Sequence, residues 1–304
     1  MGSRGRCQRI RRKSDGKVLV WKEVCCETLS KSETRTLISK VNHQKMARHP
    51  NIVRCYDCIV DSANTKIYVV MEECTGDNLA DLIASASRER RHLDEKFILQ
   101  VIAQLTSALK TFYRKRNGKP IFHHNLKAGN VFLDSEQNVK LGKPSYTNTN
   151  QMSFDNKCDI WSLGCLLYEL CTLCRYVPSS GQKVLAEKIP ARTLIKIPGQ
   201  YSKELCMLLN NMLNLTDDLR PSMESILQSN LLAEVVEEEA KKAQGCSELA
   251  KRNKMIRSAR KNKENLAPGD PQLVMLDNIA RRPRTDSQHT SQVDKDRHVR
   301  QLRF

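Results

Sequence analysis

The pattern of apolar and polar positions predicts strands early in the chain and helices afterwards. Apolar and polar residues alternate between positions 6 and 24, interrupted by the turn sequence Ser14-Asp15-Gly16, which predicts a β-hairpin. Residues 51–53 and 66–71 are short apolar runs typical of two more strands. Helical spacing of apolar residues is found over 30–47, 77–87, 94–116, 157–172, 203–213 and 222–228, with Ser32 as the expected N-cap of the first helix. This order predicts an α+β protein.

Charge and composition narrow the class of protein. Lys and Arg total 51 against 34 Asp and Glu, a formal net charge of +17, which favours acidic partners. Aromatic residues are 5% of the chain and do not alternate with basic ones, so nucleic acid is not an expected partner. No apolar run approaches the roughly 20 residues of a membrane helix, and no apolar segment follows the basic start as in a secretory signal. We therefore expect a soluble intracellular protein with no membrane partner.

The twelve cysteines are scattered along the chain. Two Cys-x-x-Cys pairs, Cys55/Cys58 and Cys171/Cys174, lie far apart, and neither is followed by His or Cys at the spacing of a zinc finger. We therefore interpret the cysteines as reduced thiols, as expected in the cytoplasm or the nucleus.

Five polar motifs follow one another in the order found in protein kinases. They are Trp21-Lys22 and residues 71–74, 123–130, 159–164 and 220–222. In that order they resemble the lysine that binds nucleotide phosphates, the hinge that holds adenine, the catalytic loop, the buried Asp-x-Trp-Ser-x-Gly helix and the late arginine of the large lobe. Residues 49–57 and 158–170 further resemble the NIMA-related kinases, most closely their centrosomal mitotic member, and the resemblance extends over roughly residues 2–233.

The resemblance implies a two-lobed, protein-kinase-like α+β fold. Residues 1–74 would form a small β-rich N-lobe that lacks its first strand, and residues 75–232 a larger helical C-lobe with a shortened activation segment. Residues 233–304 would add a helical extension, supported by two Glu–Lys pairs spaced four residues apart, and a mostly disordered basic tail from Gly245 onward.

The same resemblance implies ATP and Mg²⁺ as cofactors, both bound weakly. Asn125 occupies the position of the catalytic aspartate, and an amide cannot accept a proton at neutral pH. Lys127 is retained in the catalytic loop as a phosphate contact, and Asn130 would give a partial metal site. The residues expected to meet the nucleotide are Gly5, Cys7, Lys22, Met71, Glu72, Cys74 and Asn130. The resemblance thus predicts a nucleotide site whose chemistry is defective.

Two further positions depart from the kinase pattern, and a third, Arg220, is retained without its usual partner. Lys40 occupies the position of the helix glutamate that pairs with Lys22, and two ammonium groups repel; Glu33, about two turns earlier, is an alternative partner. Where Asp-Phe-Gly should begin, the chain has Lys143, and nearly all of the activation segment is missing. Arg220 would then lack its usual carboxylate, and a buried unpaired charge is costly.

The motifs that pack the fold are intact, whereas the positions that would carry out phosphoryl transfer are altered. This contrast predicts a pseudokinase, which acts through protein interactions in a cell-cycle setting. Two alternatives remain open: an active Ser/Thr protein kinase that transfers the γ-phosphoryl group of ATP, and a poorly folded, incomplete product. The expected partners are proteins, among them an active NIMA-related kinase or its centrosomal partners. Lys263-Glu264-Asn265, followed by Pro268, matches a KEN degron read by the anaphase-promoting complex. The expected location is the cytoplasm, the centrosome or the nucleus.

Overall fold

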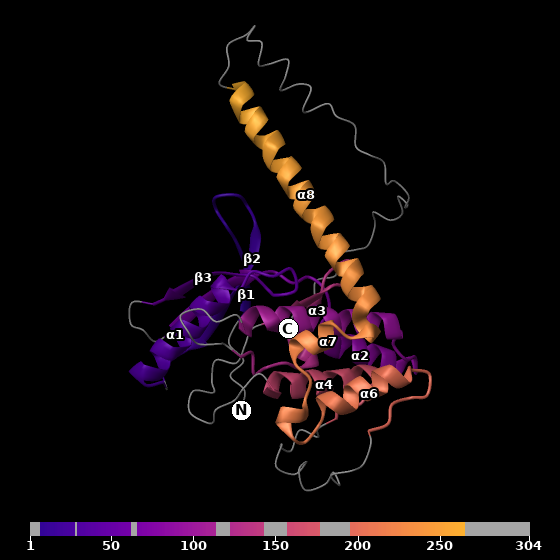
Figure 1. The fold of residues 1–304 in the computed structure, drawn as a ribbon. Coiled ribbons are helices and arrows are strands. Elements are labelled where there is room, and N and C mark those ends of the chain that lie inside the picture. The colour runs from indigo at the N-terminus through magenta and orange to yellow at the C-terminus, as the bar shows by residue number, and fades with distance from the viewer. Residues whose placement is uncertain are drawn as a thin grey trace. The chain divides into compact units, whose positions relative to one another are not determined.

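The computed structural model describes residues 7–27, 29–61, 66–113, 122–142, 157–176 and 195–264 (Figure 1). The chain divides into two compact units, Met1–Glu239 and Ala240–Phe304. The first unit holds the described strands and the helices up to the beginning of α8 (Ala233–Glu264), which continues into the second unit. Within the described ranges, no helix combines the length and the apolar character needed to cross a membrane.

A four-stranded antiparallel sheet begins the first unit. Its strands, ordered β1-β2-β4-β3, are β1 (Cys7–Arg11), β2 (Val18–Cys25), β3 (Cys55–Val60) and β4 (Lys66–Glu72). The predicted hairpin is confirmed: β1 and β2 pair, and the Gly16 amide donates to the Arg12 carbonyl at 2.9 Å. Gly16 has φ of 71°, a conformation that glycine adopts without strain, which explains why the turn sequence was informative.

The predicted strand at residues 51–53 is wrong because this segment pairs outside the sheet. The Leu141 amide donates to the Asn51 carbonyl at 2.8 Å, and the Val53 amide donates to the Leu141 carbonyl at 2.9 Å. Ile52 therefore forms an isolated bridge with Leu141, and the strand that joins the sheet, β3, begins only at Cys55.

Helix α1 (Lys31–Met46) covers one face of the sheet (Figure 1). Leu37 and Val41 on the helix are buried together with Cys55, Ile67 and Val69 on the strands. These residues form a small core of their own, which holds α1 against β3 and β4.

Helix α1 starts with a capping box at Ser30, so the expectation of Ser32 as the N-cap is wrong. The Glu33 amide donates to Ser30 Oγ at 3.2 Å, and the Ser30 amide donates to Glu33 Oε2 at 2.8 Å. The hydrogen bonds from Ser30 hold the pKa of Glu33 below its ordinary value. This carboxylate, the alternative partner considered for Lys22, is thus engaged at the start of its own helix.

The larger core is helical. It is built by α2 (Leu79–Arg88), α3 (Glu95–Tyr113), α4 (Lys157–Thr172), α6 (Lys203–Met212), α7 (Met223–Leu227) and the beginning of α8, with the hairpin of β5 (Val131–Leu133) and β6 (Val139–Leu141). Helix α4 crosses this core, and a Cβ on Gly164 would lie 2.9 Å from Met212 and Leu213 on and after α6. The glycine therefore permits the close helix contact, and the α+β organisation expected from the sequence is confirmed.

Helix α8 continues to Glu264, well past Gly245, where we expected the mostly disordered tail to begin. Strong helix formers (Ala, Glu, Lys and Arg) dominate the segment, and a single internal glycine costs only about 1 kcal/mol. Of the KEN tripeptide, Lys263 and Glu264 end the helix with side chains that are not described, while Asn265 lies outside the described residues.

Candidate functional site

A buried carboxylate on α4 holds the predicted catalytic loop in place. Asp159, which is fully buried, accepts hydrogen bonds from the His123 amide (2.8 Å), the His124 amide (2.9 Å) and the Tyr113 hydroxyl (3.0 Å). His124 has φ of 51°, an uncommon left-handed conformation for a residue with a side chain. Helix α4 therefore dictates the path of the loop and sustains the strain at His124.

His123 connects this loop to the end of β6. Its Nε2–H donates to the Gly142 carbonyl at 3.2 Å, which leaves Nδ1 as the unprotonated nitrogen of a neutral ring. Burial lowers the pKa of His123, and its ring packs against Phe112 with centroids 5.7 Å apart. His123 is thus a neutral structural link between the loop and the strand.

Asn125, Asn130 and Gly142 come together at the end of the loop. Asn130 Nδ2 donates to the Asn125 carbonyl at 3.0 Å, and the Gly142 amide donates to the Asn130 carbonyl at 2.8 Å. A Cβ at position 142 would lie 2.2 Å from Asn130 Oδ1, so this contact requires glycine. The two amides supply donors and acceptors but no group that takes up a proton near pH 7. Lys127 is exposed beside them, and its carbonyl accepts the Asn130 amide at 2.9 Å.

Lys22 lies on β2, opposite Cys7 on β1 and Val69 on β4. Directly opposed residues project from the same face of a sheet, and Val69 belongs to the core beneath α1, so Lys22 is on the face that α1 covers. The ion pairs among the described residues all involve other lysines and arginines. Lys40 lies on α1, but its side chain is not described, so the predicted repulsion stays a prediction.

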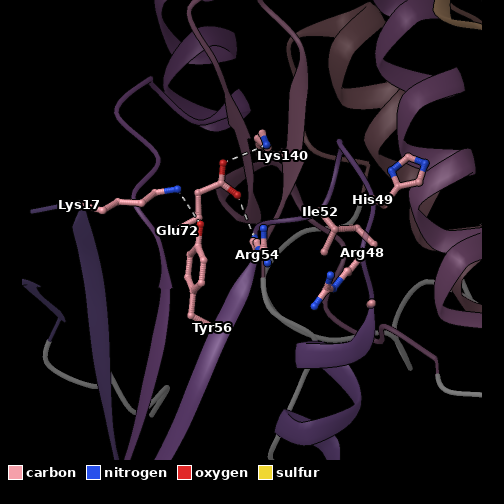
Figure 2. A pocket seen from close by; sticks show the side chains of 9 residues that line it. Lys17, Arg48, His49, Ile52, Arg54, Tyr56, Glu72 and Lys140 are labelled. Atoms are coloured by element: carbon pink, nitrogen blue, oxygen red, sulfur yellow. Dashed lines mark hydrogen bonds and ion pairs between the residues drawn. The ribbon is translucent and has the colours of Figure 1, made fainter. Parts of the chain in front are cut away.

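The predicted hinge residues follow one another at the end of β4. Met71 is opposite Val20 and therefore shares the face of Lys22. The Glu72 side chain points to the other face, as Figure 2 shows, where it accepts from the Arg54 amide and from Lys140 Nζ, each at 3.0 Å. Cys74 is half-buried, and burial raises the pKa of its thiol to about 11, so it remains protonated.

The partial magnesium site expected at Asn130 stays a prediction. Mg²⁺ is bound by oxygen ligands that usually include one or two carboxylates, and Asn130 offers an amide oxygen. Asp134, four residues after Asn130, accepts the Glu136 and Asn138 amides at 2.9 and 2.8 Å in the β5–β6 turn. Over the described ranges, His, Cys, Asp and Glu form no group of three that could hold a metal ion. Gly5 and Lys143 lie outside those ranges.

Arg220 has partners, so the expectation of a costly unpaired charge is wrong. Its guanidinium nitrogens donate to the carbonyls of Asn214 (2.8 Å), Lys157 (3.1 Å) and Leu215 (3.4 Å). The guanidinium also lies over the Trp161 ring, 4.8 Å from its centroid. Carbonyl dipoles and an aromatic face therefore satisfy the arginine within the described residues.

Sequence reasoning missed two supports of this site. Tyr113 is the last residue of α3 and belongs to an apolar helical pattern, so nothing in the sequence signalled that its hydroxyl reaches Asp159. Gly142 did carry a signal, because a glycine directly after a strand often marks a close approach of two chain segments.

Comparisons with known proteins agree with these motifs. The model of the protein kinase domain matches residues 1–143 and 144–232. The serine/threonine-protein kinase Nek2 of Homo sapiens is 46% identical over 265 residues, covering 79% of this chain and 60% of that protein. The probable serine/threonine-protein kinase nek2 of Dictyostelium discoideum is 34% identical over 259 residues, 78% of this chain and 62% of that protein. The G2-specific protein kinase nimA of Emericella nidulans is 28% identical over 281 residues, 76% of this chain and 40% of that protein. The chain thus spans less than two thirds of the length of these relatives.

Proposed function

The chain belongs to the protein kinase family, in its NIMA-related Ser/Thr branch, and from this we propose a kinase-fold interaction protein with impaired phosphoryl transfer. The observation that carries the proposal is a contrast within the catalytic loop. Asp159 and His123 hold the loop in shape, whereas Asn125 offers an amide where transfer needs a proton acceptor. Loss of a general base typically costs about 10²–10⁴-fold in rate. Binding rather than efficient catalysis is therefore the proposed activity.

Weak binding of ATP is part of the same proposal. Protein kinases use ATP with Mg²⁺. Lys22 and Lys127 offer two ammonium groups to the phosphates, and the backbone of Glu72 and Cys74 would meet adenine. Since the described residues near Asn130 include no carboxylate free to hold Mg²⁺, the affinity for Mg-ATP should be lower than that of an active kinase.

Transfer of labelled phosphate from ATP to a generic protein substrate tests the impairment. We expect the purified full chain to transfer no more phosphate than its Lys22→Ala variant. Transfer at the rate of an active kinase, abolished by Lys22→Ala, would overturn the proposal. Asn125→Asp is the matched variant that restores the proton acceptor, and we expect it to gain little, because the metal site stays incomplete.

Thermal unfolding with and without Mg-ATP tests nucleotide binding separately. A ligand at 100 times its dissociation constant stabilises the native state by about 2.7 kcal/mol, which raises the midpoint by a few degrees in a domain of this size. We expect such a shift only at high ATP concentration, and its loss in Lys22→Ala. No shift at saturating ATP would show that the chain binds no nucleotide.

An active Ser/Thr protein kinase is the alternative, and the retention of Lys22, Lys127 and Asn130 favours it. It predicts metal-dependent ADP production that Asn130→Ala abolishes. A poorly folded product would instead unfold over a broad, low-temperature range with no response to ATP.

The setting that we propose is the cell cycle, supported by the relative whose name describes a G2-specific protein kinase. In the cytoplasm, at the centrosome or in the nucleus, the chain would compete with an active NIMA-related kinase for protein partners. Residues 263–265 would mediate its removal by the anaphase-promoting complex. Cells leaving mitosis should degrade the wild-type chain faster than the Lys263→Ala, Asn265→Ala double variant, and equal half-lives would contradict this role.

A further inference from the structure

A basic pocket of about 300 Å³ lies behind the hinge, on the face of β4 opposite Lys22 and Met71 (Figure 2). Its lining comes from segments far apart in the sequence. Lys17 enters from the β1–β2 turn, Arg48 from the segment after α1, Arg54 from the position before β3, and Lys140 from β6. Its size is at the lower end of ligand pockets, suited to one side chain or one small group.

The pocket carries an excess of positive charge. Its four strong cations face a single carboxylate, that of Glu72, which is already paired with Lys140 Nζ at 3.0 Å. Lys17, Arg48 and Arg54 are left with no described carboxylate within ion-pair distance. Three uncompensated charges around one cavity repel one another unless an anion joins them.

Tyr56 holds two of these cations at the pocket. Lys17 Nζ donates to the Tyr56 hydroxyl at 2.8 Å and lies 5.2 Å from the ring centroid, while the Arg54 guanidinium lies 4.9 Å from it. Arg12 also lies over this ring, but it is paired with Asp15. Lys17 and Arg54 are therefore held in position before any ligand arrives, which lowers the entropic cost of binding an anion.

His49, which also lines the pocket, does not change the net charge of the pocket. Its Nδ1 accepts the Asn51 amide at 3.1 Å, so Nε2 carries the hydrogen and donates to Ser107 Oγ at 2.9 Å. The ring is thus a neutral tautomer used by the fold. The positive charge of the pocket therefore comes from its lysines and arginines.

We propose that this pocket binds the phosphate of a phosphorylated serine or threonine on a partner protein. A phosphate carries close to two negative charges and three acceptor oxygens, which match two guanidinium groups and an ammonium group. A single carboxylate would leave most of the charge unbalanced. Nucleic acid is disfavoured because the site is a small cavity with one aromatic ring rather than a groove lined by several. The pocket is separate from the Lys22 site and does not depend on nucleotide binding there.

Fluorescence anisotropy with a labelled Gly-Gly-phosphoSer-Gly-Gly peptide and the full chain tests the proposal. We expect binding that the unphosphorylated peptide does not show and that weakens with added salt. Arg48→Gln and Arg54→Gln should each weaken it about 10- to 100-fold, the usual worth of a charge-assisted hydrogen bond. Arg88 is an exposed arginine on α2, so Arg88→Gln is the matched control and should bind like wild type.

Three outcomes would overturn the proposal. One is equal affinity for the phosphorylated and unphosphorylated peptides, and another is wild-type binding by both pocket variants. The third is competition by inorganic phosphate or a single-stranded oligonucleotide at concentrations far below that of the peptide, which would assign the pocket to a free anion or to nucleic acid. Tyr56→Phe provides a finer check, because it removes only the hydroxyl that positions Lys17 and should weaken binding a few-fold.

Discussion

Replacing Asp159 with alanine should destabilise the first unit strongly. The carboxylate is fully buried and is the acceptor for two backbone amides and the Tyr113 hydroxyl. A buried donor left without an acceptor costs about 1–3 kcal/mol, so leaving these three donors unsatisfied should cost about 3 kcal/mol. Native domains are stable by only about 5–15 kcal/mol, so the substitution should remove a large fraction of the total.

Urea unfolding followed by tryptophan fluorescence measures this loss, since Trp161 lies two residues from Asp159 on α4. Tyr113→Phe is the matched control: it removes one of the three hydrogen bonds but keeps the ring, and it should cost about 1 kcal/mol. If Asp159→Ala unfolded at the urea concentration of the wild type, with the same slope, the loop would not depend on this carboxylate and the reasoning would be refuted.

Three further predictions use the same unfolding measurement. Gly142→Ala should cost about 1–3 kcal/mol, because the added Cβ meets Asn130 Oδ1 at 2.2 Å; an unchanged midpoint would refute the close contact. Stability should fall as the pH drops below about 6.5, because burial lowers the pKa of His123 and the unfolded chain takes up the proton first; His123→Gln should flatten this dependence between pH 7.5 and 5.5. Ser30→Ala should cost about 1 kcal/mol and Ser32→Ala much less, and equal costs would contradict the capping box.

The end of β4 lies between two candidate sites of different character. Met71 projects toward the face of Lys22, where nucleotide is expected, and Glu72 projects toward the basic pocket. Alternation of side chains along a strand is enough to separate the two. A ligand in the basic pocket would contact the sheet and, through Lys140, β6, so it would link the two without entering the expected nucleotide site.

Features that depend on neighbouring residues were predictable. The Ser14-Asp15-Gly16 turn was recognised because a left-handed glycine is a local requirement, and α4 was placed at residues 157–172 because its apolar pattern is continuous. The motif at residues 159–164 identified a buried helix correctly. That Asp159 supports the predicted catalytic loop depends on residues 35 and 36 positions away, which no local pattern records.

Features that depend on distant partners were not predictable. Residues 51–53 have the composition of a strand, but they pair with Leu141 and not with the sheet. A pattern of hydrophobic residues does not show which segment will be the hydrogen-bonding partner. The loss of a carboxylate partner for Arg220 was inferred from the sequence, yet three carbonyls and Trp161 meet the guanidinium instead. Any backbone carbonyl can accept such a hydrogen bond, so the residue types at those positions do not predict that they contact Arg220.

The sequence by itself determined the kinase-like order of strands, helices and motifs, together with the amide at Asn125, because side-chain chemistry and local periodicity are written directly in it. Only the tertiary structure decided that Asp159 supports the loop and that Lys17, Arg48 and Arg54 surround one cavity. Such arrangements arise when segments distant along the chain pack together. The positive charge around the pocket therefore depends on the fold and not on a run of basic residues in the sequence.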